Sequence, residues 1–127
     1  MPNVRYVIAI PYGGRPLACD WHLATQSMIV PTNSSSTEIF RRGMPLDEAQ
    51  TSMVEQALQL DAEYILFIED DTEPPANTVV ELRRALASAD DSFVACGGIY
   101  TTRSAAPEPI VYMGPGEGSY WSGWTYR

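Results

Sequence analysis

The pattern of hydrophobic and polar positions predicts strands that are buried within a sheet. Residues 64–68 are five apolar residues without alternation, which is typical of an interior strand of a parallel sheet whose two faces are both covered. Residues 4–10 form a similar run, rich in β-branched residues. We expect a further buried strand over residues 92–100 and a short one over residues 110–113.

Apolar residues at helical spacing lie between these strands and predict three helices. The expected helices span residues 18–29, a segment that begins at Pro45, and residues 76–88. Residues 32–37 are polar and predict a loop, followed by a short strand over residues 38–41. The side chains expected to face inward are Trp21, Ala24 and Met28 in the first helix, Ala49, Met53, Val54, Ala57, Leu58 and Leu60 in the second, and Val79, Leu82 and Leu86 in the third.

This order of elements predicts an α/β fold with three layers, α/β/α, around a mostly parallel sheet. Strands that alternate with helices form right-handed crossovers, which place helices on both faces of the sheet. From Gly114 onward the chain is rich in Gly, Ser and aromatic residues and has no periodicity. We therefore divide the chain into one domain, residues 1–113, and a C-terminal tail, residues 114–127.

The strongest chemical signal is an acidic segment, residues 69–73, which directly follows a predicted strand. Carboxylates at the carboxyl end of such a strand lie where open α/β sheets bind ligands. In an extended segment Glu69 and Asp71 point to one side and Asp70 to the other. Two carboxylates on one rim suit Mg²⁺ or Mn²⁺, which typically take one or two carboxylates plus substrate phosphates. The structural alternative is that Asp71 or Thr72 caps the next helix.

Three loops should meet at the carboxyl edge of the sheet: residues 11–16, residues 69–73 and residues 101–103. The first contains two glycines, which allow backbone amides to approach a ligand, and the guanidinium of Arg15. The third contributes Arg103. An ordinary turn and two solvated arginines are the structural alternatives.

Composition excludes several classes of function. All eight basic residues are Arg, so Schiff-base chemistry and a P-loop lysine are excluded. The net charge of -8 argues against non-specific binding of nucleic acid. The apolar runs are too short to cross a bilayer and the start does not look like a signal peptide, so we expect a cytoplasmic protein without a transmembrane segment. Cys19 and Cys96 form no motif, and we expect both to be buried.

Taken together, residues 4–112 resemble the GT-A fold of the nucleotide-diphospho-sugar glycosyltransferases, in particular the family-2-like enzymes. The acidic segment corresponds to the DxD motif of that family and reads Glu69-Asp70-Asp71 here. The resemblance implies a Rossmann-like core in which Asp71 contacts the metal, Mn²⁺ or Mg²⁺, and Glu69 or Asp70 assists. The pieces that carry it are residues 10–15, the helix after Pro45, and residues 62–75, 96–100 and 107–109.

The implied activity is metal-dependent transfer of a sugar from a UDP- or GDP-linked donor to an unknown acceptor. Family members often carry an Arg that holds the diphosphate where this chain has Gln50. Glu108 and Glu117 are the candidate catalytic bases. The candidate substrate-binding residues are Pro11, Tyr12, Gly13, Gly14, Arg15, Gln50, Asp70 and Arg103, and the candidate metal ligands are Glu69 and Asp71.

The half that supplies the acceptor site in typical members is nearly absent from these 127 residues. An alternative is therefore a non-catalytic or truncated nucleotide-sugar-binding protein, or an assembly subunit, derived from such an enzyme. A nucleotidyltransferase on a related fold is disfavoured because those enzymes need a lysine. We also expect a homodimer or higher oligomer that buries the aromatic side chains of the tail, Tyr120, Trp121, Trp124 and Tyr126.

Overall fold

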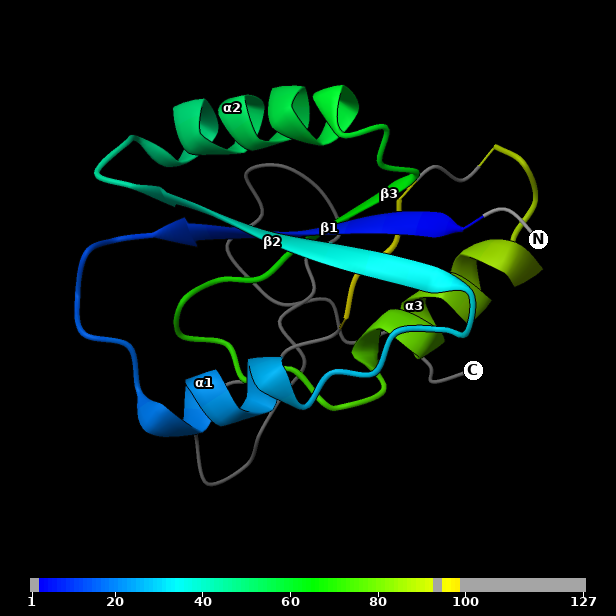
Figure 1. Cartoon of the computed structure of the whole chain (residues 1–127), viewed down its shortest axis with the longest axis horizontal. Coiled ribbons are helices and arrows are strands. Elements are labelled where there is room, and N and C mark those ends of the chain that lie inside the picture. The colour runs from blue at the N-terminus through cyan, green and yellow to red at the C-terminus, as the bar shows by residue number, and fades with distance from the viewer. Residues whose placement is uncertain (1–2, 93–94, 99–127) are drawn as a thin grey trace, which may run out of the picture.

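The computed structural model describes residues 3–92 and 95–98 of the chain. Strands and helices alternate along the described part, in the order β1, α1, β2, α2, β3, α3 (Figure 1). Their bounds are β1 Val4–Tyr12, α1 Cys19–Gln26, β2 Ser34–Arg42, α2 Leu46–Gln59, β3 Tyr64–Phe67 and α3 Thr78–Ser88. The predicted α/β class is confirmed.

The sheet has three parallel strands in the order β2-β1-β3. β1 is central, and its residues 6–10 are all buried. Ala9 lies opposite Ile39 of β2 and opposite Phe67 of β3. Because the strands are parallel and in register, all three end at one edge, which we call the carboxyl edge.

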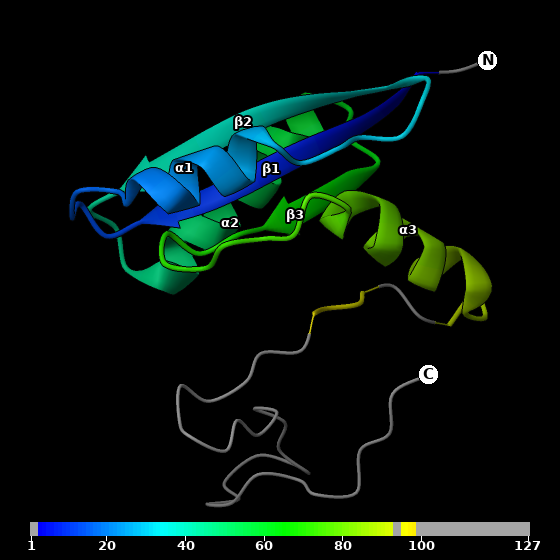
Figure 2. The ribbon, with the colours of Figure 1, turned by 90° about the horizontal axis from the view of Figure 1, so that it is seen from below.

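Helices cover both faces of this sheet, because successive residues of β1 point to opposite sides. Figure 1 shows α2 on one side of the sheet and α1 and α3 on the other, and Figure 2 views the molecule from the side of α1 and α3. The two buried clusters are Val7, Ala9, Ile39, Ala49, Met53 and Ala57 under α2, and Tyr6, Ile8, Ile10, Trp21, Ile68 and Val79 under α1 and α3.

The predicted polar loop over residues 32–37 is wrong, because residues 34–37 belong to β2. β2 lies at the edge of the sheet and is exposed along most of its length, with Ile39 its buried residue. β2 pairs with β1 through backbone hydrogen bonds, which do not require apolar side chains. The hydrophobic pattern of the sequence therefore does not reveal this strand. The predicted interior position of residues 64–68 is not found either, because β3 is the other edge of the described sheet.

Two predictions of burial are also wrong. Val54 and Leu58 of α2 are 38% and 69% exposed, because the buried face of this helix is formed by residues at a spacing of four, Ala49, Met53 and Ala57. Cys19 and Cys96 are both exposed.

The third helix is confirmed, with Val79 buried and Leu82 and Leu86 half-buried. Of the strand expected over residues 92–100, the four residues 95–98 are exposed and have no regular structure. The rest of that strand, apart from Ser92 in a turn, the strand over residues 110–113 and the aromatic tail lie outside the described residues. Within the described ranges, none of the helices is long and apolar enough to span a membrane.

Candidate functional site

Two of the three loops expected to meet at the carboxyl edge do meet. The backbone N–H of Gly13, in the loop after β1, donates a hydrogen bond of 3.0 Å to Oδ2 of Asp70, in the segment after β3. This contact joins residues 57 positions apart. The third loop, with Arg103, and the candidate bases Glu108 and Glu117 lie outside the described residues.

The acidic segment turns instead of continuing as a strand. β3 ends at Phe67, and the backbone N–H of Thr72 donates to the carbonyl of Glu69 at 3.3 Å, which closes a turn around Asp70 and Asp71. The alternation expected for an extended segment therefore does not apply. The capping alternative is wrong as well, because α3 begins at Thr78 and neither Asp71 nor Thr72 precedes it directly.

The three carboxylates of this turn differ in their surroundings. Asp70 is half-buried and accepts the bond from Gly13, so its carboxylate holds the loop after β1 in place. Glu69 and Asp71 are exposed, and within the described residues neither carboxylate takes part in a hydrogen bond or ion pair. They are accessible to a ligand from solvent.

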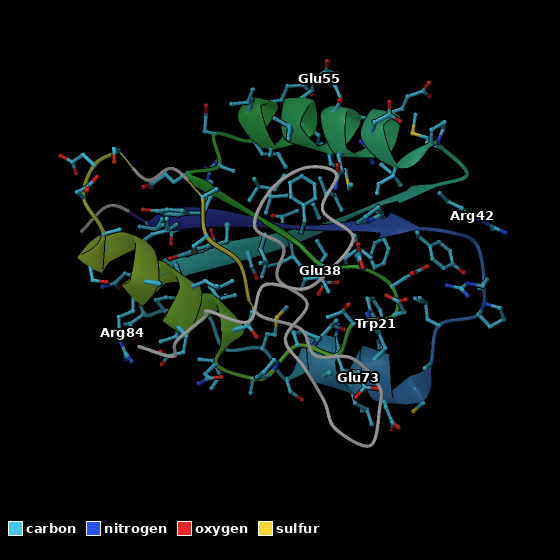
Figure 3. All side chains as sticks on the ribbon, turned by 180° about the vertical axis from the view of Figure 1, so that it is seen from behind. Trp21, Glu38, Arg42, Glu55, Glu73 and Arg84 are labelled. Carbon is cyan, nitrogen blue, oxygen red and sulfur yellow. The ribbon has the colours of Figure 1, made fainter. Side chains whose placement is uncertain are left out.

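The buried indole of Trp21 fixes the position of the acidic turn. Trp21 is 2% exposed, and its Nε1–H donates a 2.9 Å hydrogen bond to the backbone carbonyl of Glu69. Figure 3 shows this side chain projecting from α1 toward the sheet. Periodicity predicts that Trp21 faces inward but gives no sign of its bond to Glu69, because that bond depends on how α1 packs.

A topological switch point lies between β1 and β3, because the chain leaves β1 for β2 on one side and β3 pairs on the other. β1 continues into α1 on one face of the sheet, and β2 continues into α2 on the other (Figure 1). Open α/β sheets bind ligands outside the carboxyl ends of their strands, at the point where the strand order reverses. Tyr12 and Arg42, the last residues of β1 and β2, lie opposite each other in the register.

Arg42 is a residue of this edge that the sequence analysis missed. Its guanidinium carbon lies 5.8 Å from the centroid of the Tyr12 ring. Its Nε lies 3.2 Å from the position that a Cβ on Gly14 would occupy. The only sequence signal was its place after the apolar pair Ile39 and Phe40, which is a weak indication of a strand end.

Gly14 is the position of this loop that requires glycine. Its φ is +89°, a backbone conformation that residues with a side chain rarely adopt. We expect Gly14→Ala to lower the free energy of unfolding by about 1–3 kcal/mol. Gly13→Ala is the matched control, because a Cβ at Gly13 would meet Asp70 at an ordinary 3.6 Å, and its effect should be smaller. Urea denaturation of both variants tests this, and equal losses would contradict the conformation described for Gly14.

The remaining charges of the described chain lie away from the carboxyl edge or have no partner there. The one ion pair in residues 3–92 and 95–98 joins Arg84 to Glu81 on the exposed surface of α3. Hydrogen bonds from the side chain and backbone of Ser92 lower the pKa of Asp90, which follows α3. Arg15 is exposed in the loop after β1. Both signs of charge are thus present at the carboxyl edge without pairing to each other in the described structure.

The donor set fits a hard divalent cation that is shared with a ligand. No group of three or more His, Cys, Asp or Glu side chains that could hold a metal occurs in the part of the chain described here. Mg²⁺ and Mn²⁺ sites of the kind expected need only one or two carboxylates, because substrate phosphates complete the coordination. Glu69 and Asp71 are exposed carboxylates, so their residue types are among the ligands that these cations take.

The chain matches no family model, and no curated protein or solved structure is similar to it.

Proposed function

We propose that this chain is a glycosyltransferase domain with a Rossmann-like GT-A core, which transfers a sugar from a UDP- or GDP-linked donor to an acceptor. The observation that carries the proposal is the hydrogen bond between Gly13 and Asp70. It brings a glycine-containing loop and an acidic turn together at the edge where parallel sheets bind ligands. The donor class comes from the sequence resemblance. The hydrogen bond supports the expected proximity of the glycine-containing loop and the acidic turn.

Each group at this edge has a distinct role in the proposal. Asp71, with Glu69, would hold the divalent cation, whose charge would offset the negative charge of the diphosphate leaving group. Asp70 is a positioning residue, because its carboxylate holds the loop through Gly13. Residues 11–15, which are the end of β1 and the start of the loop after it, bind the nucleotide. The acceptor hydroxyl loses its proton to a carboxylate base, for which Glu108 and Glu117 remain the candidates.

A screen of nucleotide-sugars by thermal unfolding tests the proposal directly. A ligand that binds only the folded state stabilises it, by about 2.7 kcal/mol at a hundred times its Kd. We expect UDP- or GDP-linked sugars to raise the Tm in the presence of Mn²⁺ and to raise it less in the presence of a chelator. If none of them changes the Tm with Mn²⁺, the proposal is wrong.

A transfer and hydrolysis assay on the ligands that bind separates an enzyme from a non-catalytic binder. Released nucleoside diphosphate indicates turnover. Metal-dependent binding without any release would favour the binding protein or assembly subunit.

Gln50 offers a test of where the diphosphate lies. It is half-buried near the start of α2, the end of that helix that follows β2 at the carboxyl edge. We expect Gln50→Arg to tighten donor binding by about 1–3 kcal/mol, because a guanidinium forms charge-assisted hydrogen bonds with phosphate. Gln59→Arg, with the same change of charge at the other end of α2, is the control. Calorimetry showing equal affinities for both variants would mean that Gln50 does not face the diphosphate.

A further inference from the structure

We propose that Arg42 and the loop at Gly14 form a subsite for the phosphate groups of the ligand, at the carboxyl ends of β1 and β2. The identity of the ligand as a nucleoside diphosphate rests on the proposed function. The subsite itself, which takes a di-anionic phosphate group, rests on the surroundings of Arg42. It would supply the guanidinium that the chain lacks at Gln50.

The first argument is the position of Arg42. It is the last residue of β2, opposite Tyr12, the last residue of β1. Figure 3 shows Arg42 at the end of the sheet where the loop after β1 leaves toward α1. Its charge therefore lies at the carboxyl edge, on the opposite side of β1 from Asp70 and the acidic turn.

The second argument is that the guanidinium of Arg42 has no acidic partner among residues 3–92 and 95–98. Most arginines of the described residues form no ion pair, so this absence leaves the Arg42 guanidinium available to an anion without setting it apart. The Arg42 guanidinium lies near the Tyr12 ring and beside Gly14. Its planar fork of N–H donors matches two oxygens of a phosphate group.

The third argument is the shape of the loop. A side chain at residue 14 would approach Nε of Arg42 to 3.2 Å and its terminal nitrogen to 3.6 Å. The glycine therefore leaves the guanidinium free to lie against the backbone of the loop. The Tyr12 ring, within cation–π range, limits the directions in which the side chain can turn. An arginine held in this way loses less conformational freedom when it binds an anion.

The neighbouring arginine provides a matched control. Arg41 points to the opposite face of β2, where its Nε donates a 3.0 Å hydrogen bond to Oγ of Ser52 and its terminal nitrogen donates to Gln56. Ser52 and Gln56 belong to α2, and the other terminal nitrogen of Arg41 donates to the carbonyl of Phe40 at 2.9 Å. The Arg41 guanidinium is thus held by hydrogen bonds to α2, whereas the Arg42 guanidinium is available to bind an anion. The two residues have the same charge and are adjacent in sequence.

The experiment compares wild type, Arg42→Gln, Arg42→Lys and Arg41→Gln by calorimetry with inorganic pyrophosphate, UDP and GDP in the presence of Mn²⁺. Uridine, which has no phosphate, is the control ligand. We expect Arg42→Gln to weaken pyrophosphate and at least one nucleotide about tenfold or more. Arg42→Lys should recover part of the loss, and Arg41→Gln should change binding less than threefold. Circular dichroism establishes that each variant is folded.

The outcomes separate the subsite from the proposed function. If pyrophosphate binds in an Arg42-dependent manner but nucleotide-sugars bind no better than pyrophosphate, the subsite is supported and the proposed function is wrong. If nucleotide-sugars bind with Mn²⁺ and Arg42→Gln has no effect, the subsite is overturned and the proposed function stands. Equal losses in Arg41→Gln and Arg42→Gln, or no binding of any phosphate compound to wild type, also overturn the subsite.

Discussion

Replacing Trp21 by Ala is expected to lower the free energy of unfolding by about 3–5 kcal/mol, the usual range for removing a buried aromatic side chain. Trp21 is 2% exposed and packs in the cluster that includes Ile10, Ile68 and Val79. Its removal leaves a cavity between α1 and the sheet, and it leaves the Glu69 carbonyl without its indole donor. For a domain of this size such a loss is a large part of the total stability.

Two variants separate packing from hydrogen bonding. Trp21→Phe retains most of the apolar bulk and loses the bond to Glu69, so we expect a smaller loss, about 1–3 kcal/mol. Leu23→Ala, on the same helix but at a side chain that is 57% exposed, should change stability little. Urea denaturation followed by far-ultraviolet circular dichroism measures all three. A Trp21→Ala protein as stable as Leu23→Ala would contradict the described packing of α1.

The elements that the sequence predicts correctly are those that bury a continuous or periodic apolar face. β1 is central, and β3 is short but apolar, so both stand out as runs. α2 shows a period of four through Ala49, Met53 and Ala57. The start of β2 is missed because Ser35, Ser36 and Thr37 are exposed at a sheet edge and pair with β1 through the backbone.

In the candidate site, too, some features could be predicted from the sequence and others could not. The meeting of the Gly13 loop with Asp70 is predictable, because the carboxyl ends of parallel strands share one edge. The roles of Trp21 and Arg42 are not. The bond of Trp21 depends on the packing of α1, and the place of Arg42 depends on the register of a strand whose first half looks like a loop. The sequence does not predict the turn at Asp71 either, because an apolar run does not show where the pairing of a strand with its neighbour ends.

The largest expected effect on ligand binding is that of Asp71→Asn. We expect this change to remove most of the gain in UDP or GDP affinity that Mn²⁺ provides, about tenfold or more, which corresponds to about 1.4 kcal/mol. An amide has nearly the same shape as a carboxylate but carries no charge to offset that of the cation. Asp71 is exposed and has no hydrogen-bond partner in the described residues, so the fold should be unaffected.

Asp61→Asn is the matched control, because it removes the same charge from an exposed residue that precedes β3, at the opposite end of that strand. Asp61 has a φ of 52°, which Asn tolerates well, so this variant should fold normally and keep the full gain from Mn²⁺. Calorimetry of wild type and both variants, each with Mn²⁺ and with chelator, gives the comparison. If wild type binds UDP or GDP with equal affinity in Mn²⁺ and in chelator, the proposed metal dependence is wrong. A full Mn²⁺ gain in Asp71→Asn would instead transfer the ligand role to Glu69, since Asp70 is engaged by the Gly13 amide.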